Sequence, residues 1–193
     1  MNQHILTLAS ASPRRKQLLE MLGIPIEVIP SHVPEVRAPH EDPISYVRRL
    51  AHAKARSVPG TYVLGADTTV ILGGEILEKP VDADDAFRML RKLAGRTHEV
   101  ATAIALVKGG QLFEAVDVSK VTFRGADDAF LRAYVATGEP MDKAGAYGIQ
   151  GFGAALIDRL EGDFFGVMGL PVRKVLDLLA NAGWPYRFGQ PAS

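Results

Sequence analysis

Apolar residues along the chain fall into short runs and into helical spacing, and these two patterns alternate. The apolar runs at residues 4–9, 24–29 and 62–66 predict buried strands, since each is short and bounded by polar residues, glycine or proline. Apolar positions three or four residues apart predict helices, whose ends are set by capping and stop residues. The predicted helices are 13–22, 43–57, 82–95, 126–137 and 171–183.

Glycine pairs predict two antiparallel hairpins, because such pairs favour the tight turns that join neighbouring strands. One hairpin has its turn at Gly73-Gly74, and the other, with longer strands, at Gly109-Gly110. A further short strand is expected at 154–157, within a glycine-rich segment. The predicted fold class is therefore α/β, with a mixed sheet that includes antiparallel hairpins.

Composition narrows the class of protein. The 193 residues fit a single domain spanning 1–193, and a hydrophobic content of 47% is enough for a normal core. Lys and Arg number 22, as do Asp and Glu, so the chain has no net charge and nucleic acid is not an expected partner. The lack of cysteine excludes disulfides and thiolate catalysis. No signal peptide or membrane-spanning segment is recognisable, so we expect a cytoplasmic protein without a membrane partner.

The junction of the first strand and the first helix predicts an anion-binding site. Ser12 is a good N-cap and Pro13 suits the first helical position, so free N–H groups and the positive end of the helix dipole face a ligand. Ser10, Arg14 and Arg15 add hydroxyl and guanidinium donors there. The alternative is an ordinary capped helix with a solvated basic turn. Phosphate binding is favoured, because basic residues are unfavourable in a first turn unless an anion compensates.

Asp67 is the candidate catalytic base. It is expected to end the third apolar run, directly after Gly65 and Ala66, whose small size lets a ligand approach the backbone. A carboxylate at the carboxyl edge of a strand is a usual place for a catalytic base or a magnesium ligand. The alternative is a turn aspartate that precedes Thr68 and Thr69.

Three more charged residues carry a weaker signal. Lys54 lies among alanines on the predicted second helix, and this small face could let its ammonium point inward. Lys79 precedes Pro80, which would hold its ammonium in a fixed place. Glu35 is the acidic residue of a proline-rich loop. Taken alone, each has a simpler explanation as a solvated charge.

Residues 142–151 are dense in glycine and alanine around Tyr147 and Gln150. Gln150 offers both a donor and acceptors, which suits the edge of a nucleobase. Backbone packed on a flat ligand and a tight loop whose glutamine satisfies backbone groups explain this composition equally well, so both interpretations stay open.

Motifs that the chain lacks narrow the chemistry. It has no P-loop, no dinucleotide-binding glycine fingerprint and no nucleophile elbow. Its five histidines also lack the spacing of metal ligands. Basic groups together with carboxylates, without an obvious protein nucleophile, point to metal-assisted attack by water on a phosphoanhydride.

Seven ordered blocks of the sequence resemble the Maf family of nucleoside triphosphate pyrophosphatases, from Leu6 to about Gly183. The blocks are Ala-Ser-Ala-Ser-Pro-Arg-Arg at 9–15, Leu-Ala-x-Ala-Lys-Ala at 50–55, Gly-Ala-Asp-Thr at 65–68, Lys-Pro at 79–80, Gly-Arg-Thr-His-Glu-Val at 95–100, Gly-Glu-Pro-x-Asp-Lys-Ala-Gly-Ala-Tyr-Gly-Ile-Gln-Gly at 138–151 and Gly-Leu-Pro at 169–171. Departures from the family pattern occur at His32 and Pro34, at Glu78 and at 165–168. None replaces a residue that matches the family's chemistry.

The resemblance implies an elongated, twisted sheet with flanking helices and two lobes around a central cleft, a fold related to the inosine triphosphate pyrophosphatases. It implies hydrolysis of a nucleoside triphosphate to the monophosphate and pyrophosphate, with Mg²⁺ or Mn²⁺ as cofactor, and it implies a homodimer. Asp67 matches the family's proton acceptor and Glu35 its acidic loop residue, and these two would hold the metal.

The remaining matches concern the substrate. The phosphate-binding groups match Ser10, Arg14, Arg15, Lys54 and Lys79, and Ser12 belongs to the same expected site. The positions that distinguish the dTTP/UTP branch match Arg14, Thr68 and Gln150. The sequence thus predicts an enzyme that hydrolyses dTTP and UTP by metal-activated attack of water on the α-phosphate. Modified pyrimidine triphosphates would use the same residues and stay open as substrates. The alternative from another class is a catalytically silent nucleotide-binding regulator of cell division.

Overall fold

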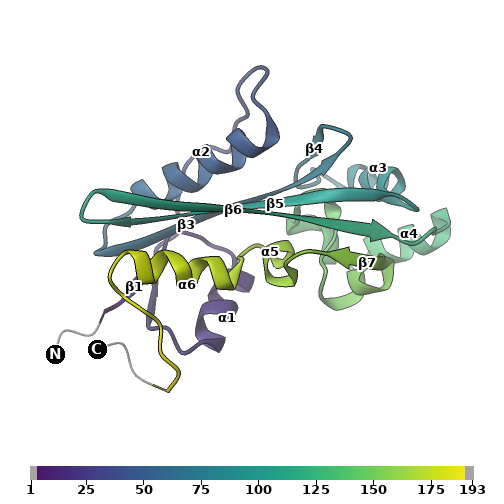
Figure 1. Cartoon of the computed structure of the whole chain (residues 1–193). Helices are drawn as coiled ribbons and strands as arrows, with labels where there is room; N and C mark the ends of the chain where they lie inside the picture. The colour runs from purple at the N-terminus through teal and green to yellow at the C-terminus, as the bar shows by residue number, and fades with distance from the viewer. Residues whose placement is uncertain (1–3, 190–193) are drawn as a thin grey trace. The chain divides into compact units, whose positions relative to one another are not determined.

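A computed structural model describes residues 4–189 as alternating strands and helices, drawn in Figure 1. The strands are β1 (Leu6–Leu8), β2 (Ile26–Val28), β3 (Tyr62–Leu72), β4 (Glu75–Leu77), β5 (Thr97–Lys108), β6 (Gln111–Phe123) and β7 (Ile157–Glu161). The helices are α1 (Pro13–Met21), α2 (Pro43–Arg56), α3 (Ala83–Leu93), α4 (Asp128–Ala136), α5 (Phe164–Met168) and α6 (Val172–Asn181), with short 3₁₀ helices η1 (Glu139–Asp142), η2 (Ala144–Ala146) and η3 (Gly151–Leu156). None of the helices in this described range is long and apolar enough to cross a lipid bilayer.

The strands of the described residues form one mixed sheet. Its order is β2-β1-β3-β5-β6-β7, with β4 paired to β3 outside this path. β1 pairs in parallel with both β2 and β3, placing Leu6 opposite Ile26 and Tyr62. β4 pairs antiparallel with β3, and β7 pairs antiparallel with β6. The predicted mixed α/β class is therefore confirmed, including the hairpin turns at both glycine pairs.

The chain divides into two compact units. The first contains the described residues up to Asp67 together with 102–117 and those from Gly169 onward, and the second contains 68–101 and 118–168. Three long strands, β3, β5 and β6, contribute residues to both units. Within the first unit, Figure 1 shows α2 on one side of the strands and α1 and α6 on the other.

α2 approaches β3 unusually closely at Gly65. A Cβ at this position would lie 2.3 Å from the carbonyl oxygen of Ala51 and 2.5 Å from the backbone nitrogen of Ala55. Ala51 and Ala55 are themselves buried. The helix begins at an N-cap, Asp42, whose carboxylate accepts hydrogen bonds from the first-turn N–H groups of α2. Small residues on both elements therefore set how near the helix lies to the strand.

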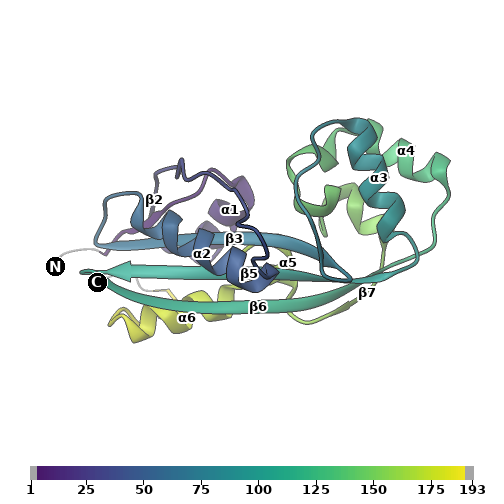
Figure 2. The same cartoon turned by 90° about the horizontal axis from the view of Figure 1, so that it is seen from above.

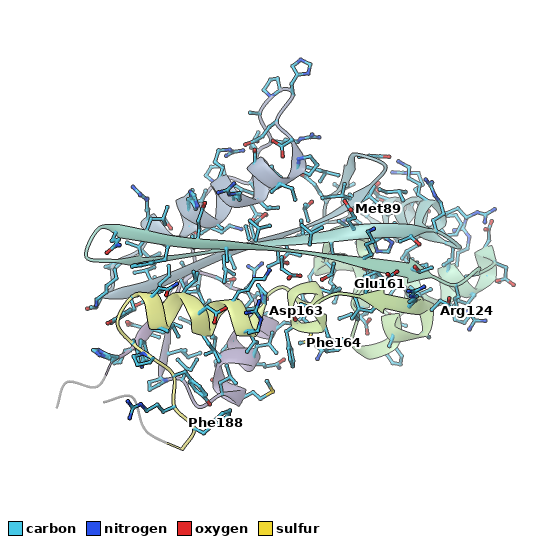
Figure 3. All side chains as sticks on the ribbon, viewed as in Figure 1. Met89, Arg124, Glu161, Asp163, Phe164 and Phe188 are labelled. Carbon is cyan, nitrogen blue, oxygen red and sulfur yellow. The ribbon has the colours of Figure 1, made fainter. Side chains whose placement is uncertain are left out.

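The second unit has a separate apolar core. α3 packs against α4, η1 and η2, and Figure 2 shows α3 and α4 together on this unit. Leu90, Leu93 and Leu131 are fully buried there against side chains from the strands. The short helix α5 is capped by Asp163, labelled in Figure 3, whose carboxylate accepts hydrogen bonds from the N–H groups of Phe165 and Gly166.

His98 of β5 lies inside this second core and is 2% exposed. Its Nε2 is 2.7 Å from the hydroxyl of Tyr147, and its ring packs edge-on against Phe123. Burial lowers the pKa of His98 to about 4, so the ring is neutral at physiological pH. Its position is that of a core residue of this unit.

Two local predictions were wrong, and one short helix was missed. β3 does not end at Asp67 but continues to Leu72, because its later residues pair with β4. Residues 154–157 do not form a strand, since they fall mostly within η3, and the strand begins at Ile157. α5 was not predicted at all; it has only five residues and follows an aspartate cap.

We predict that Gly65→Ala destabilises the protein by roughly 1–3 kcal/mol, because the added methyl must push α2 away from β3. Urea denaturation should show an earlier unfolding midpoint. Gly125→Ala is the matched control, because a Cβ at Gly125 would meet no atom within 4 Å. Equal midpoints for both variants would show that α2 tolerates the displacement.

Candidate active site

The predicted cap of the first helix is confirmed, and it organises the residues that follow β1. Ser12 has an extended backbone, and its hydroxyl oxygen accepts a hydrogen bond from the N–H of Arg15 at 3.5 Å. The hydroxyl oxygen of Ser10 accepts one from the N–H of Ser12 at 3.2 Å. Pro13 occupies the first turn, where no backbone donor is lost. The turn between β1 and α1 is thus held in shape by its own serines.

Arg15 folds back over this turn. Its Nη1 donates to the hydroxyl of Ser10 at 3.1 Å, and its Nε donates to the carbonyl of Gly169 at 2.8 Å. The pKa of Arg15 is lowered, mainly by burial and further by the positive charge of Arg14. The negative charges of Asp67 and Glu35 act in the opposite direction. An arginine remains protonated in proteins, so a fixed positive charge stands near both carboxylates.

The central feature of the first unit is a lysine shared by two carboxylates. The Nζ of Lys54 donates to Oδ1 of Asp67 at 2.6 Å and to Oε1 of Glu35 at 2.5 Å. Lys54 and Asp67 are 7% and 6% exposed, whereas the Glu35 side chain is 41% exposed. The two carboxylates therefore meet at one ammonium, with Glu35 on the solvent side.

Packing of α2 on β3 brings this group together. Gly65 and Asp67 are two residues apart on one strand and so face the same side of the sheet. Ala51 and Ala55 cover Gly65, and Lys54 beside them reaches Asp67. The suggestion that a face of alanines lets Lys54 point inward is confirmed by its burial.

Glu35 is placed by the loop that precedes α2. Its backbone carbonyl accepts a hydrogen bond from the hydroxyl of Tyr46 at 3.2 Å, and Tyr46 is buried on α2. Farther along the loop, Arg49 of α2 donates to the carbonyl of Val36 and to the carboxylate of Glu41. The same helix that carries Lys54 therefore also holds the loop that carries Glu35.

The environment of Asp67 suits a base. Burial raises the pKa of Asp67 above its usual range, and the negative charge of Glu35 also raises it. The charge and hydrogen bond of Lys54 and the charge of Arg15 act in the opposite direction. Burial dominates, so this carboxylate holds a proton more readily than a solvated aspartate. A catalytic base is most effective when its pKa is raised in this way towards the working pH.

The carboxylates of Glu35 and Asp67 also fit a divalent cation. Hard cations such as Mg²⁺ and Mn²⁺ prefer oxygen ligands, and Mg²⁺ is commonly held by one or two carboxylates together with substrate phosphates. Across residues 4–189, no cluster of three or more metal-ligating side chains occurs. The oxygen ligands that this site offers to a divalent cation are therefore the carboxylates of Glu35 and Asp67.

The other predicted site residues lie apart in the sequence and in the two units. Arg14 belongs to the first unit, on α1. The second unit contains Thr68, Lys79 and Gln150. Thr68 follows Asp67 on β3 and so faces the opposite side of the sheet. Lys79 and Gln150 are exposed, and Gln150 does not use its side chain to cap η3.

Sequence reasoning missed two residues that organise the segment around Gln150. The carboxylate of Glu139 accepts hydrogen bonds from the backbone N–H groups of Phe152 and Gly153 and from the hydroxyl of Tyr134. The glycine density of this segment is therefore explained by packing on the protein's own side chains. The signal in the sequence was the run of glycines at Gly148, Gly151 and Gly153, which follows Glu139 closely.

Comparisons with known proteins extend over most of the chain. The model of a family described as Maf-like protein matches residues 5–182. A dTTP/UTP pyrophosphatase of Anaeromyxobacter dehalogenans strain 2CP-1 is 48% identical over 190 residues, covering 96% of this chain and 98% of the relative. A dTTP/UTP pyrophosphatase of Escherichia coli strain 536 is 49% identical over 181 residues, covering 91% and 92%. The solved structure of the Staphylococcus aureus Ham1 protein is similar with a TM-score of 0.45 and 16% identity, over 79% of each chain.

We predict that Lys54→Met destabilises the protein by about 3 kcal/mol at pH 7, because it leaves Asp67 buried without its partner. Removing the ammonium raises the pKa of Asp67 further, so the folded state binds a proton more tightly than the unfolded state. The destabilisation should therefore shrink as the pH falls towards the ordinary pKa of aspartate, about 4.

Urea denaturation at several pH values measures this dependence. Lys16→Met serves as the control, since Lys16 forms an exposed pair with Glu20 at 3.6 Å and should have little effect at any pH. A Lys54→Met effect that is constant between pH 4 and pH 7 would contradict the assignment of Asp67 as its charged partner.

Proposed function

The chain belongs to the Maf family, and from this premise we propose that it hydrolyses dTTP and UTP to the nucleoside monophosphate and pyrophosphate. The observation that carries the proposal is the buried Lys54 ammonium held between Asp67 and Glu35, beside Arg15 and Ser10. This cluster combines a base of raised pKa with cationic groups suited to phosphates. The curated relatives, which are named as dTTP/UTP pyrophosphatases, support the choice of substrate.

The reaction begins with binding of the triphosphate at the turn between β1 and α1. Ser10, Ser12, Arg14 and Arg15 supply hydroxyl, backbone and guanidinium donors for its oxygens. Asp67 accepts a proton from a water molecule, whose oxygen attacks the α-phosphorus. The bond between this phosphorus and the bridging oxygen breaks, and pyrophosphate leaves with the bonding electrons. The cationic side chains of Lys54 and Lys79 stabilise the negative charge that develops on the phosphate oxygens.

A divalent metal belongs to this proposal as cofactor. Glu35 and Asp67 would hold Mg²⁺ or Mn²⁺, which would neutralise phosphate charge and lower the pKa of water. Lys54 keeps these two carboxylates close together and balances their charge. The protein's own contribution is therefore to hold two oxygen-bearing side chains ready, while its arginines bind the anion.

Base selection is assigned to Arg14, Thr68 and Gln150. Gln150 is exposed and can both donate to and accept from the edge of a pyrimidine. Modified pyrimidine triphosphates fall within the same proposal. A catalytically silent regulator of cell division is not favoured, because the candidate base is present and the curated relatives are named as pyrophosphatases.

The first test is pyrophosphate release from canonical and modified nucleoside triphosphates, with and without Mg²⁺ or Mn²⁺. We expect metal-dependent release from dTTP and UTP, and little from ATP or GTP. Asp67→Asn should slow turnover by about 10²–10⁴-fold, since it removes the base. Nucleotide binding should largely survive in that variant, which calorimetry can measure.

The matched control is Asp177→Asn, which removes an exposed carboxylate from α6 in the same unit. It should leave turnover unchanged. Full activity of Asp67→Asn would exclude the mechanism, and no release from any triphosphate with either metal would exclude the activity itself.

We also propose that the protein acts as a homodimer, as the family resemblance implies. Sedimentation velocity should then give twice the 20.8 kDa mass of one chain at working concentration. Sedimentation as a monomer throughout the concentration range would reject the dimer without affecting the proposed reaction.

A further inference from the structure

The segment 148–153, which carries Gln150 and is called here the glutamine loop, is held by a polar anchor with a half-buried glutamate and a buried tyrosine. Gln150 itself is exposed and occupies the N-cap position of η3 without making a side-chain cap. The polar anchor beneath it consists of Glu139 in η1 and Tyr134 in α4. All of these residues belong to the second unit, so the loop and its anchor form one local structure.

Glu139 binds the loop through its backbone. Oε2 accepts a hydrogen bond from the N–H of Phe152 at 2.8 Å, and Oε1 accepts one from the N–H of Gly153 at 2.9 Å. Oε1 also accepts the hydroxyl of Tyr134 at 2.9 Å. The hydroxyl oxygen of Tyr134 in turn accepts a hydrogen bond from the N–H of Gly148 at 3.3 Å. The backbone is thus held on both sides of Gln150.

The glycines of the loop fit this anchor closely. A Cβ at Gly151 would lie 2.4 Å from Oε2 of Glu139, and Gly151 has a left-handed backbone with φ of +69°. A Cβ at Gly153 would lie 2.2 Å from the carbonyl oxygen of Gly148 and 2.7 Å from the hydroxyl of Tyr134. Side chains at these positions would displace the loop from the carboxylate. The sequence around Gln150 is therefore shaped to wrap Glu139.

The anchor is a charged group at neutral pH. Burial raises the pKa of Glu139, but the hydrogen bonds from Gly153, Phe152 and Tyr134 and the charge of Lys143 lower it, and the net effect is a lowered pKa. Hydrogen bonds to an ionised acceptor are stronger and shorter than those between neutral groups. Glu139 can accept all three donors only as a carboxylate, because an amide in its place would turn a donor towards one of the N–H groups.

We propose that Glu139 is a positioning residue for base selection, with Tyr134 as its partner. Its carboxylate fixes the backbone on either side of Gln150, so that the glutamine amide meets the nucleobase in one orientation. The inference rests on the proposed function, because it needs Gln150 to contact the base. It adds a requirement that the comparisons do not give: discrimination between bases depends on a side chain that never touches the nucleotide.

The test compares Glu139→Gln with the native enzyme for pyrophosphate release from UTP and GTP. We expect the ratio of kcat/KM for UTP over GTP to fall by about tenfold or more, because a mispositioned Gln150 loses its hydrogen bonds to the correct base. KM for UTP should rise several-fold, while kcat stays within about twofold, since the proposed base Asp67 and the anion-binding turn of Ser10 and Arg15 lie in the other unit. Tyr134→Phe should shift the ratio in the same direction by less.

Two controls separate positioning from simple loss of stability. Asp128→Asn removes a carboxylate of the same unit that pairs with Arg91 and does not contact the loop, and it should leave the ratio unchanged. Gln150→Ala should lower the ratio as Glu139→Gln does, and the double variant should be no worse than Gln150→Ala alone.

The outcomes distinguish the two proposals. An active native enzyme whose UTP over GTP ratio is unchanged in Glu139→Gln, at a temperature where the variant is folded, overturns the positioning role and leaves the proposed function intact. A ratio that falls in Gln150→Ala but falls further in the double variant likewise overturns it. A native enzyme that releases pyrophosphate from none of the triphosphates overturns the proposed function, and the selective role of Glu139 with it.

Discussion

A buried ammonium between two carboxylates is the constraint on which the first unit depends. Lys54 and Asp67 are both almost fully removed from water, and each would be costly there without the other. Their pairing requires α2 to lie close to β3, and that distance is available only because Gly65 faces Ala51 and Ala55. The same helix then fixes the loop of Glu35 through Tyr46. One ion pair thus links helix packing, loop position and the candidate base.

The second unit uses the opposite arrangement of charge. In the first unit a single cation gathers two anionic side chains, whereas in the second a single anion, Glu139, gathers backbone N–H groups and the hydroxyl of Tyr134. The charged group lies on the long helix α2 in the first unit and on the short helix η1 in the second, and in both units it organises a more irregular segment. The two arrangements fit the two proposed roles. Lys54 positions the carboxylate oxygens of the first unit for phosphate chemistry, and Glu139 positions the backbone of the glutamine loop for base selection.

The sequence allowed most elements to be predicted, because their signals are local. Ser12 with Pro13 and Asp42 with Pro43 mark helix starts, and the glycine pairs mark hairpins. Errors arose where distant contacts override local preference. β3 continues through Asp67 because its later residues pair with β4, while Lys54, thirteen positions earlier, compensates the buried charge of Asp67.

Contacts between residues distant in the sequence also explain the wrong prediction near Gln150. η3 covers most of the expected strand, and it begins beside Phe152 and Gly153, whose N–H groups bond to Glu139. The candidate site was predicted from residue types and from the family resemblance. The structure brings Lys54, Asp67 and Glu35 of this set together, and their roles in phosphate chemistry stay predictions. The anchoring roles of Glu139 and Tyr134 were not predicted, since the contacts that define them form only when η1 and the glutamine loop lie side by side.

The imidazole of His98 makes the second unit sensitive to proton uptake. Because the ring is buried and its pKa falls to about 4, the folded protein leaves it neutral where an unfolded chain, with a pKa near 6.5, would already bind a proton. Unfolding between these two pH values therefore takes up a proton, and the free energy of unfolding falls as the solution becomes more acidic across this interval. His98 is hydrogen-bonded to Tyr147, three residues before Gln150, so the ring that stays neutral only in the folded state is joined to the segment proposed to recognise the base.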